Sequence, residues 1–162
     1  MADYNANHAV RIDGLYSESA TPAGTNGVPL GIEYRVPYTS GSGDYKSNLY
    51  YASRMLTSGT NIDLNGGSIA DPLGNSITFT TIRGILVVNR SVTTGETCTL
   101  SGDFVTSVLM SGGAGSIVIK PGGIYYVEAP VDGYTVVQTT GDNIVFTFTN
   151  QTLGIDVFMW GS

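Results

Sequence analysis

The sequence predicts an all-β protein, in which an antiparallel β-sandwich or barrel follows an extended N-terminal arm. From about residue 48 onward, runs of β-branched and aromatic residues alternate with turn signals at short, regular spacing. No stretch carries the apolar stripe of an amphipathic helix. Before residue 46, prolines, glycines and serines interrupt every apolar run. We therefore expect an arm over residues 1–46 and a single sandwich domain over residues 47–162.

The domain is expected to consist of short strands. They span Asn48 to Leu56, Asn61 to Leu64, Ser76 to Asn89, Thr97 to Leu100, Phe104 to Met110, Ser116 to Lys120, Ile124 to Glu128, Tyr134 to Gln138, Asn143 to Thr149 and Ile155 to Trp160. Residues that tolerate positive φ lie between them, as in Pro121-Gly122-Gly123. Phe146 and Phe148 alternate with Val145 and Thr147, which is the period-2 pattern of a half-buried strand.

The arm contains only one hint of a strand, at Gly31 to Val36, yet it is rich in tyrosine. Ordering each of its residues costs about 1–2 kcal/mol, and its own apolar content is small. We therefore expect the arm to lie on a partner protein, with tyrosines as anchors and arginines facing acidic groups. The candidate partner-binding residues are Tyr4, Arg11, Tyr16, Tyr34, Arg35 and Tyr38.

Composition excludes several classes of function. The net charge is −6 and no basic cluster could neutralise successive phosphates, so we expect no nucleic-acid partner. The first residues lack the pattern of a signal peptide and no apolar run approaches a membrane span, so we expect a protein made in a cytoplasm. The single Cys98 cannot form an internal disulfide and is expected to be an inert, buried hydrophobe.

The residues do not predict an enzyme, a metal site or a cofactor. The one histidine, His8, lies in the arm, far from any preorganised pocket. Carboxylate pairs such as Asp63 with Asp71 and Asp132 with Asp142 lie beside glycine, proline or asparagine, which favours hydrogen bonds to their own backbone in Asx turns. No calcium-loop spacing is present. A deep pocket that gathered Asp103, Asp142 or Glu128 beside a metal would favour an enzyme instead.

Two further features have simple structural interpretations. The glycine-rich stretch Ser111 to Ser116 is expected to be a hairpin loop between strands, because a phosphate cradle requires glycines that open a helix. The aromatic residues of the predicted strands are expected to form core contacts and cross-strand pairs rather than a surface that stacks on sugars. They are Tyr50, Tyr51, Tyr125, Tyr126, Phe158 and Trp160.

The order of turns and strands in the second half resembles a known class of virus proteins. The segments that carry the resemblance are Ile62-Asp63-Leu64, Asp71-Pro72-Leu73-Gly74, Ile82 to Asn89, Lys120-Pro121-Gly122-Gly123, Ala129-Pro130, Gly133-Tyr134-Thr135-Val136 and Asp156 to Gly161. Together they resemble the small β-sandwich proteins that decorate the heads of tailed bacteriophages, and related phage virion proteins. The resemblance covers about residues 55–162 and leaves the arm outside.

The resemblance implies a jelly-roll-like domain, a homotrimer seated on the major capsid protein, and a role as a capsid cement. We therefore expect a structural virion protein that binds the outer surface of a phage head and stabilises contacts between capsid subunits, without a cofactor. The alternative is a glycan- or receptor-binding module of a head fibre or tail component. Tyrosines open to solvent on one face would favour glycan binding, whereas tyrosines buried at subunit contacts would favour cement.

Overall fold

The chain divides into two compact units. The computed structural model describes residues 6–18, 26–38, 48–67, 69–70, 74, 76–129 and 131–162, and for 6–18, 26–38 and 48–55 it describes the backbone alone. One unit is built on strands β1 (Ala6–Glu18) and β2 (Asn26–Tyr38), and the other spans Ser42–Ser162. Within the described ranges, no helix has the length and apolarity needed to cross a membrane.

The N-terminal unit is a long antiparallel pair of strands. Its register runs without interruption from Ala6 opposite Tyr38 to Glu18 opposite Asn26. The strand expected at Gly31 to Val36 lies within β2, whereas β1 was not predicted. Prolines in β2 obscured the strand in the sequence, but each strand of a two-stranded sheet is an edge, where proline is tolerated.

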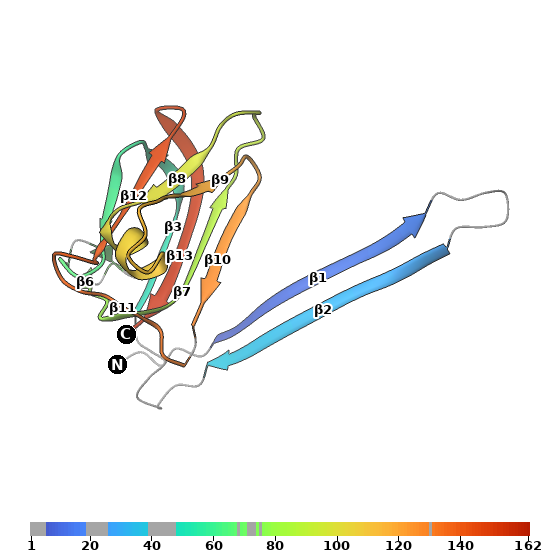
Figure 1. Ribbon diagram of the computed structural model, residues 1–162, viewed down its shortest axis with the longest axis horizontal. Helices are drawn as coiled ribbons and strands as arrows, with labels where there is room; N and C mark the ends of the chain where they lie inside the picture. Colours follow the sequence, from blue (N-terminus) through green and yellow to red (C-terminus); the bar gives the residue numbers. More distant parts are fainter. Residues whose placement is uncertain are drawn as a thin grey trace. The chain divides into compact units, whose positions relative to one another are not determined.

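The second unit contains two larger sheets, and every strand pair is antiparallel (Figure 1). The five-stranded sheet has the order β10-β7-β13-β3, with β11 also beside β7, and the four-stranded sheet has the order β4-β12-β8-β9. The strands of the first are β3 (Asn48–Thr57), β7 (Thr81–Asn89), β10 (Ile124–Glu128), β11 (Tyr134–Thr135) and β13 (Thr152–Gly161). Those of the second are β4 (Thr60–Asp63), β8 (Cys98–Ser101), β9 (Ile117–Ile119) and β12 (Asn143–Phe148). A short pair, β5 (Ile69–Ala70) and β6 (Ser76–Ile77), completes the described strands.

This strand order is that of a jelly roll. Strands β3, β13, β7 and β10 form one sheet, and β4, β12, β8 and β9 form the other, so the chain crosses repeatedly from sheet to sheet. The predicted all-β, jelly-roll-like sandwich is therefore confirmed. Strands β9 and β10 are consecutive and are the last strands of their respective sheets, so their edges lie on the same side of the sandwich.

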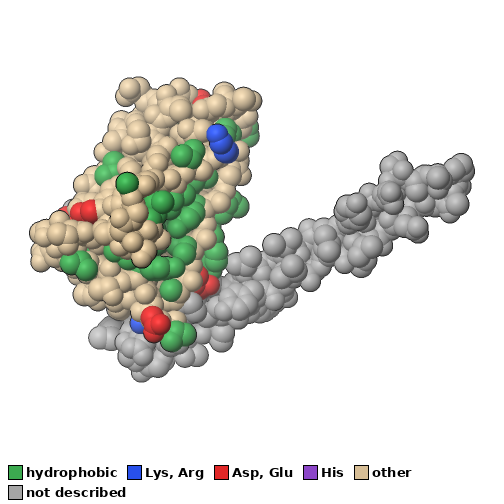
Figure 2. Space-filling model, in the orientation of Figure 1, with side chains coloured by type: hydrophobic (Ala, Val, Ile, Leu, Met, Phe, Trp, Pro, Cys, Tyr) green, Lys and Arg blue, Asp and Glu red, His purple; other side chains and the backbone are tan. Residues whose placement is uncertain are grey.

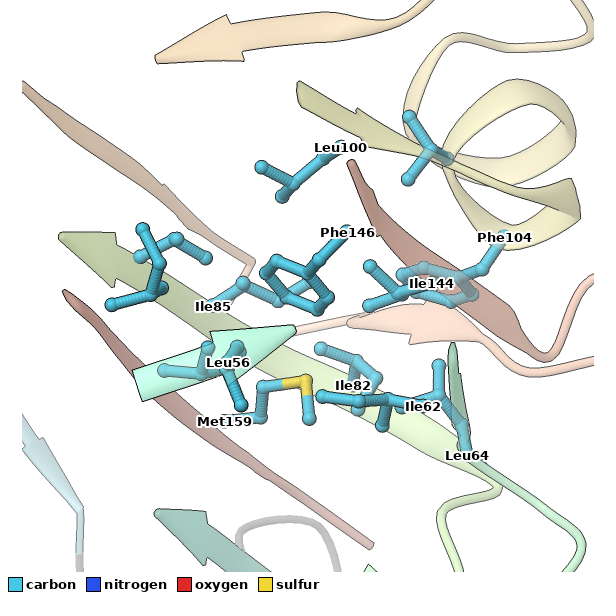
Figure 3. Packing of buried hydrophobic residues seen from close by; sticks show 14 of the residues in the cluster. Leu56, Ile62, Leu64, Ile82, Ile85, Leu100, Phe104, Ile144, Phe146 and Met159 are labelled. Carbon is cyan, nitrogen blue, oxygen red and sulfur yellow. The ribbon is translucent and has the colours of Figure 1, made fainter. Parts of the chain in front are cut away.

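A single hydrophobic core joins the two sheets (Figure 3). Ile85 and Met159 enter it from the five-stranded sheet, and Leu100 and Phe146 enter it from the four-stranded sheet. In β12 the predicted alternation is confirmed, because Phe146 and Phe148 are buried while Thr147 is exposed. Burial of each large side chain contributes about 1.5–3 kcal/mol to folding.

One predicted strand is wrong, because Phe104 to Met110 forms a π-helical turn, η1 (Phe104–Leu109). The amide of Met110 donates to the carbonyl of Val105 at 2.9 Å, which is the wider spacing of a π-helix. Phe104 and Val105 are buried, and the hydroxyl of Thr106 donates back to the Gly102 carbonyl at 3.1 Å. β-branched residues made this segment resemble a strand, but the apolar positions fit one side of a helical turn.

Two other predicted strands are shorter than expected. The span from Ser76 to Asn89 is divided into β6 and β7 by residues 78–80, where the amide of Phe79 donates to the Leu64 carbonyl at 2.7 Å. The span from Tyr134 to Gln138 contributes only β11 before the chain turns. Both differences affect strand ends and leave the two-sheet arrangement unchanged.

Candidate docking surface

Three of the carboxylates considered in the sequence, Asp63, Asp103 and Asp142, accept hydrogen bonds from nearby backbone amides. Oδ1 of Asp63 accepts hydrogen bonds from the amides of Asn65 at 3.0 Å and Gly66 at 2.7 Å, so the predicted Asx turn is confirmed there. Asp71 lies outside the described residues. Asp132 is exposed beside the turn that leads into β11.

Asp103 and Asp142 lie close together and hold the end of η1 against β12. Oδ1 of Asp103 accepts from the amides of Asp142 at 3.2 Å and Asn143 at 2.7 Å. Oδ2 of Asp142 accepts from the Thr139 amide at 2.7 Å, and its Oδ1 accepts from the Asn143 side chain at 2.6 Å. These carboxylates therefore anchor backbone rather than converge on a shared cavity.

Among the residues that the structure describes, no group of three or more His, Cys, Asp or Glu could hold an ion. His8 lies on β1, where the backbone alone is described.

Cys98 lies in β8 with its side chain in the core. Burial raises the pKa of its thiol from 9.0 to about 12, which keeps the thiol protonated and unreactive. The interpretation of Cys98 as a buried hydrophobe is confirmed.

A polar side chain in the core links the two sheets near their β9 and β10 edges. Asn89, at the end of β7, is fully buried. Its Nδ2 donates to the carbonyls of Glu96 at 3.0 Å and Ile119 at 3.2 Å, and its Oδ1 accepts from the Ser91 amide at 3.0 Å. Because Ile119 belongs to β9, this amide connects the five-stranded sheet to the edge strand of the other sheet.

Hydrophobic side chains that are exposed or only partly buried gather on one side of the domain. We call it the apolar side, and it consists of exposed or partly buried residues of η1, β9, β10, β11 and the adjoining turns. Its residues are Val108, Leu109, Met110, Ile117, Ile124, Tyr125, Tyr126, Val127, Val131, Tyr134 and Val137. Two large exposed hydrophobic residues of the described chain lie elsewhere, Val92 in a turn and Val118 opposite Thr99 on the outer face of the four-stranded sheet.

The apolar side is visible as a band of hydrophobic side chains in Figure 2. Exposure is large for several members, reaching 65% for Ile124 and 73% for Val131. Val108 and Val137 come together at Gly141, where an added Cβ would lie 3.3 Å from Val108 Cγ2 and 3.6 Å from Val137 Cβ. Exposed hydrophobic residues that gather on one side of a domain mark interaction sites more often than scattered exposed residues do.

Two exposed, oppositely charged residues flank β10 in the sequence. Lys120 precedes the turn into β10 and Asp132 follows β10. Lys120 lines a shallow hollow with Val92, Thr94 and Thr97, so it lies beside the turn that follows β7.

Sequence reasoning missed the apolar side, although a signal was present. In a strand, successive side chains point to opposite faces, so the four consecutive apolar residues Ile124–Val127 cannot all enter one core. Tyr125 and Val127 pack against the core, whereas Ile124 and Tyr126 are exposed. Four consecutive hydrophobic residues, without the alternation of polar and apolar positions, therefore indicated that this strand has a second apolar face.

The aromatic residues at the end of the chain form a cross-strand cluster on the outer face of the five-stranded sheet. The ring centroid of Trp160 lies 6.3 Å from that of Tyr126 and 5.6 Å from that of Phe158. Trp160 is only 4% exposed and lies across Gly84, where an added Cβ would be 1.9 Å from the indole. Phe158 and Trp160 are two residues apart on β13, and the indole reaches over β7 to Tyr126 of β10, so these rings pack on one another but are not pairs on neighbouring strands.

The candidate partner-binding residues of the arm fall in the N-terminal unit. Tyr4 lies outside the described residues, Arg11 and Tyr16 are positions of β1, and Tyr34, Arg35 and Tyr38 are positions of β2. The register pairs Tyr34 with Val10 and Tyr16 with Val28, and it pairs Arg11 with Glu33. By alternation, the three tyrosine positions of the strands share one face of the pair, and the two arginine positions share the other.

No family model, no curated protein and no solved structure matches this chain.

Proposed function

We propose that this protein is a structural docking protein of a virus particle, which binds the outer surface of a phage head and stabilises contacts between subunits. The observation that carries the proposal is the apolar side, a group of exposed and partly buried hydrophobic residues around η1 and the β10 edge of a jelly roll. The phage setting comes from the resemblance of residues 55–162 to head decoration proteins. The homotrimer implied by that resemblance remains a prediction.

The fold is compatible with the proposal and with its alternative. Jelly rolls serve both as viral capsid domains and as lectin domains, so the choice depends on the surface and not on the fold. A sugar-stacking platform requires open aromatic ring faces. In the Tyr126–Phe158–Trp160 cluster the rings pack on one another and Trp160 is buried. This geometry favours contact with protein over a glycan-binding module.

The arm is proposed to supply the contact with the major capsid protein. Its candidates are Tyr4, Arg11, Tyr16, Tyr34, Arg35 and Tyr38. A two-stranded sheet is at best marginally stable alone, so a long pair of strands gains stability when one of its faces is covered. A partner surface would provide that cover.

The mechanism would be mechanical. Each apolar contact contributes about 25 cal/mol per Å² of buried surface before the costs of association are subtracted. A protein that buries such surface against several neighbours raises the free energy needed to separate them. This role uses no cofactor and no catalytic group.

The test is to mix the purified protein with phage heads that lack it, pellet the heads, and measure their rupture temperature. We expect saturable binding and a higher rupture temperature, and we expect deletion of residues 1–46 to remove both. Thr147→Asp is the control, because this exposed residue of β12 lies outside the apolar side and the arm. A protein that stays in the supernatant would refute the cement role, and a glycan array would then test the alternative.

A further inference from the structure

We infer that the N-terminal unit joins two copies of this chain through the outer edge of β1, so that two hairpins form one four-stranded antiparallel sheet. Its strand order is β2-β1-β1-β2, with the two β1 strands related by a two-fold axis. This contact is independent of the proposed role on a phage head. Three features support it: the prolines of β2, the register of the hairpin and the charges of β1.

Prolines close the outer edge of β2. In an antiparallel strand, the N–H groups of successive residues face opposite edges. Pro29 and Pro37 are an even number of positions apart, so both lack the N–H at the same edge. The register with β1 runs through both prolines without interruption, and proline in a paired strand is found where its nitrogen faces away from the ladder. Proline at an edge hinders the addition of a further strand.

The outer edge of β1 is open to such an addition. The 13 residues of β1 include no proline, and among the described strands β1 pairs with β2 alone. Leu15 lies opposite Pro29, and a residue whose backbone groups face away from one ladder presents them to the other edge. The odd-numbered residues of β1 therefore present their N–H and C=O groups at the outer edge. A long edge strand without a blocking residue is a template for pairing with another chain.

Charge selects a second β1 as the strand that pairs there. When β1 pairs antiparallel with its own copy over its full length, Ala6 lies opposite Glu18 and the two-fold axis passes through Ile12. Arg11 of each copy then lies opposite Asp13 of the other. Opposite charges at directly opposed positions stabilise an antiparallel pair, and like charges destabilise it. A shift of the partner strand by two residues would oppose Arg11 with Arg11 or Asp13 with Asp13, so the charges favour one register.

The same register keeps the hydrophobic positions on one face. Even positions of β1 lie opposite even positions of its copy, as they lie opposite even positions of β2 in the hairpin. In the sequence, these positions include Val10, Ile12, Val28, Leu30, Ile32 and Val36. Arg11, Asp13, Glu33 and Arg35 occupy odd positions, on the other face. Two narrow hydrophobic faces thus become one four-stranded face, and three or more strands with such a face are what independent stability requires.

The experiment is sedimentation equilibrium of the full chain over a range of concentrations. We expect a reversible dimer of twice 17.0 kDa. Ala9→Pro removes a donor from the outer edge of β1, so it should weaken the dimer by at least about tenfold. Gly31→Pro is the matched control, because it adds a proline to the edge of β2 that prolines already close. It should leave the dissociation constant within about twofold of the original. Circular dichroism checks that each variant is folded.

A charge exchange tests the register. Asp13→Arg places an arginine opposite Arg11 of the other copy, and it should weaken the dimer by about tenfold because two opposed pairs become like charges. Arg11→Asp combined with Glu33→Arg should weaken it similarly, and the second change keeps opposite charges at these two opposed positions of the hairpin. A mixture of the two variants should form a mixed dimer within about threefold of the original affinity, because every arginine at the contact then lies opposite an aspartate. A fluorescent label on one variant reports the mixed dimer in the centrifuge.

Three results would overturn the inference: a monomer at every concentration, a trimer, or charge variants that associate no better when mixed than alone. An equal loss of the dimer in Gly31→Pro and Ala9→Pro would also overturn it, since the contact would not be specific to the edge of β1. The same proteins are then mixed with phage heads. Dimers that fail to bind heads would refute the proposed function and leave the inference standing, whereas monomers that bind heads would do the reverse.

Discussion

The two exposed surfaces of the sandwich are built from different kinds of residue. The outer face of the four-stranded sheet carries Asn61, Thr99 and Thr147, whereas the apolar side carries Ile124 and Tyr126 on the edge strand β10. Both surfaces are formed by strands that share the same core. The outer face of the four-stranded sheet shows that strands of this domain carry polar residues where they meet water. The apolar side is therefore better explained by contact with another protein than by the general composition of the surface.

The largest expected effect comes from the core side chain that anchors η1 beneath the apolar side. Phe104 is fully buried. Phe104→Ala removes the ring and leaves a cavity that the neighbouring side chains can only partly fill. We expect the free energy of unfolding to fall by about 3–5 kcal/mol. Denaturant titration measures the change, and Val92→Ala, at a residue 96% exposed, should change stability by less than about 0.5 kcal/mol. Equal effects for the two variants would show that η1 is not packed as described.

The second effect concerns the amide that holds β7 to the edge strand β9. Asn89→Ala leaves the carbonyls of Glu96 and Ile119 without this buried donor, and we expect a loss of about 2–3 kcal/mol. The control is Asn61→Ala on the polar face, where an exposed side chain donates one bond to Asn143 at 2.9 Å. That change should cost about 0.5 kcal/mol by thermal unfolding. A smaller loss for Asn89 than for Asn61 would contradict the proposed link between the sheets.

Much of the fold follows from local pattern. The strand predicted from Ile124 to Glu128 has the observed bounds of β10, and the alternation in β12 identified which of its residues enter the core. Turn residues such as Gly122, with φ of +68°, fixed the ends of neighbouring strands. These features depend on residues close together in the sequence, which is why they could be predicted.

Features that depend on distant contacts could not be predicted in the same way. The segment Phe104–Leu109 has strand-forming residues, but the fold places a helical turn there, held by Asp103 against Asn143 across 40 positions of sequence. The apolar side likewise arises only when β9 and β10 become neighbouring edges. Its members resemble core residues in the sequence, and only their position at the sheet edges leaves them exposed.

The third prediction concerns stability at high pH. Below pH 9 the Cys98 thiol is protonated in both states, whereas between pH 9 and about 12 it ionises in the unfolded chain first, because burial raises its pKa in the folded state. Folding stability should therefore fall with rising pH, by up to about 1.4 kcal/mol per pH unit from this group. Burial and then Tyr134 raise the pKa of Tyr125, which adds a slope of the same sign.

The comparison of wild type with Cys98→Ala separates these contributions. Both proteins are unfolded with urea at pH 8 and pH 10, and the slope of the unfolding free energy against pH is compared. The slope should be smaller in the variant, since the thiol contribution is gone and the tyrosine contribution remains. Identical slopes would show that the thiol does not stay protonated in the folded state.

The smallest expected effect on stability is an exchange of side chains between the two surfaces. Ile124 is 65% exposed on β10 at the apolar side, and Thr147 is exposed on β12. Ile124→Thr makes the apolar side more polar, and Thr147→Val makes the reverse change on the outer face of the four-stranded sheet. Each should alter the unfolding free energy by less than about 0.5 kcal/mol, because both side chains are exposed and β-branched. Only Ile124→Thr should weaken binding to phage heads in the pelleting assay, since it alone removes hydrophobic surface from the apolar side. If Thr147→Val changed head binding as much, exposed hydrophobic surface in general, rather than the apolar side, would drive the contact.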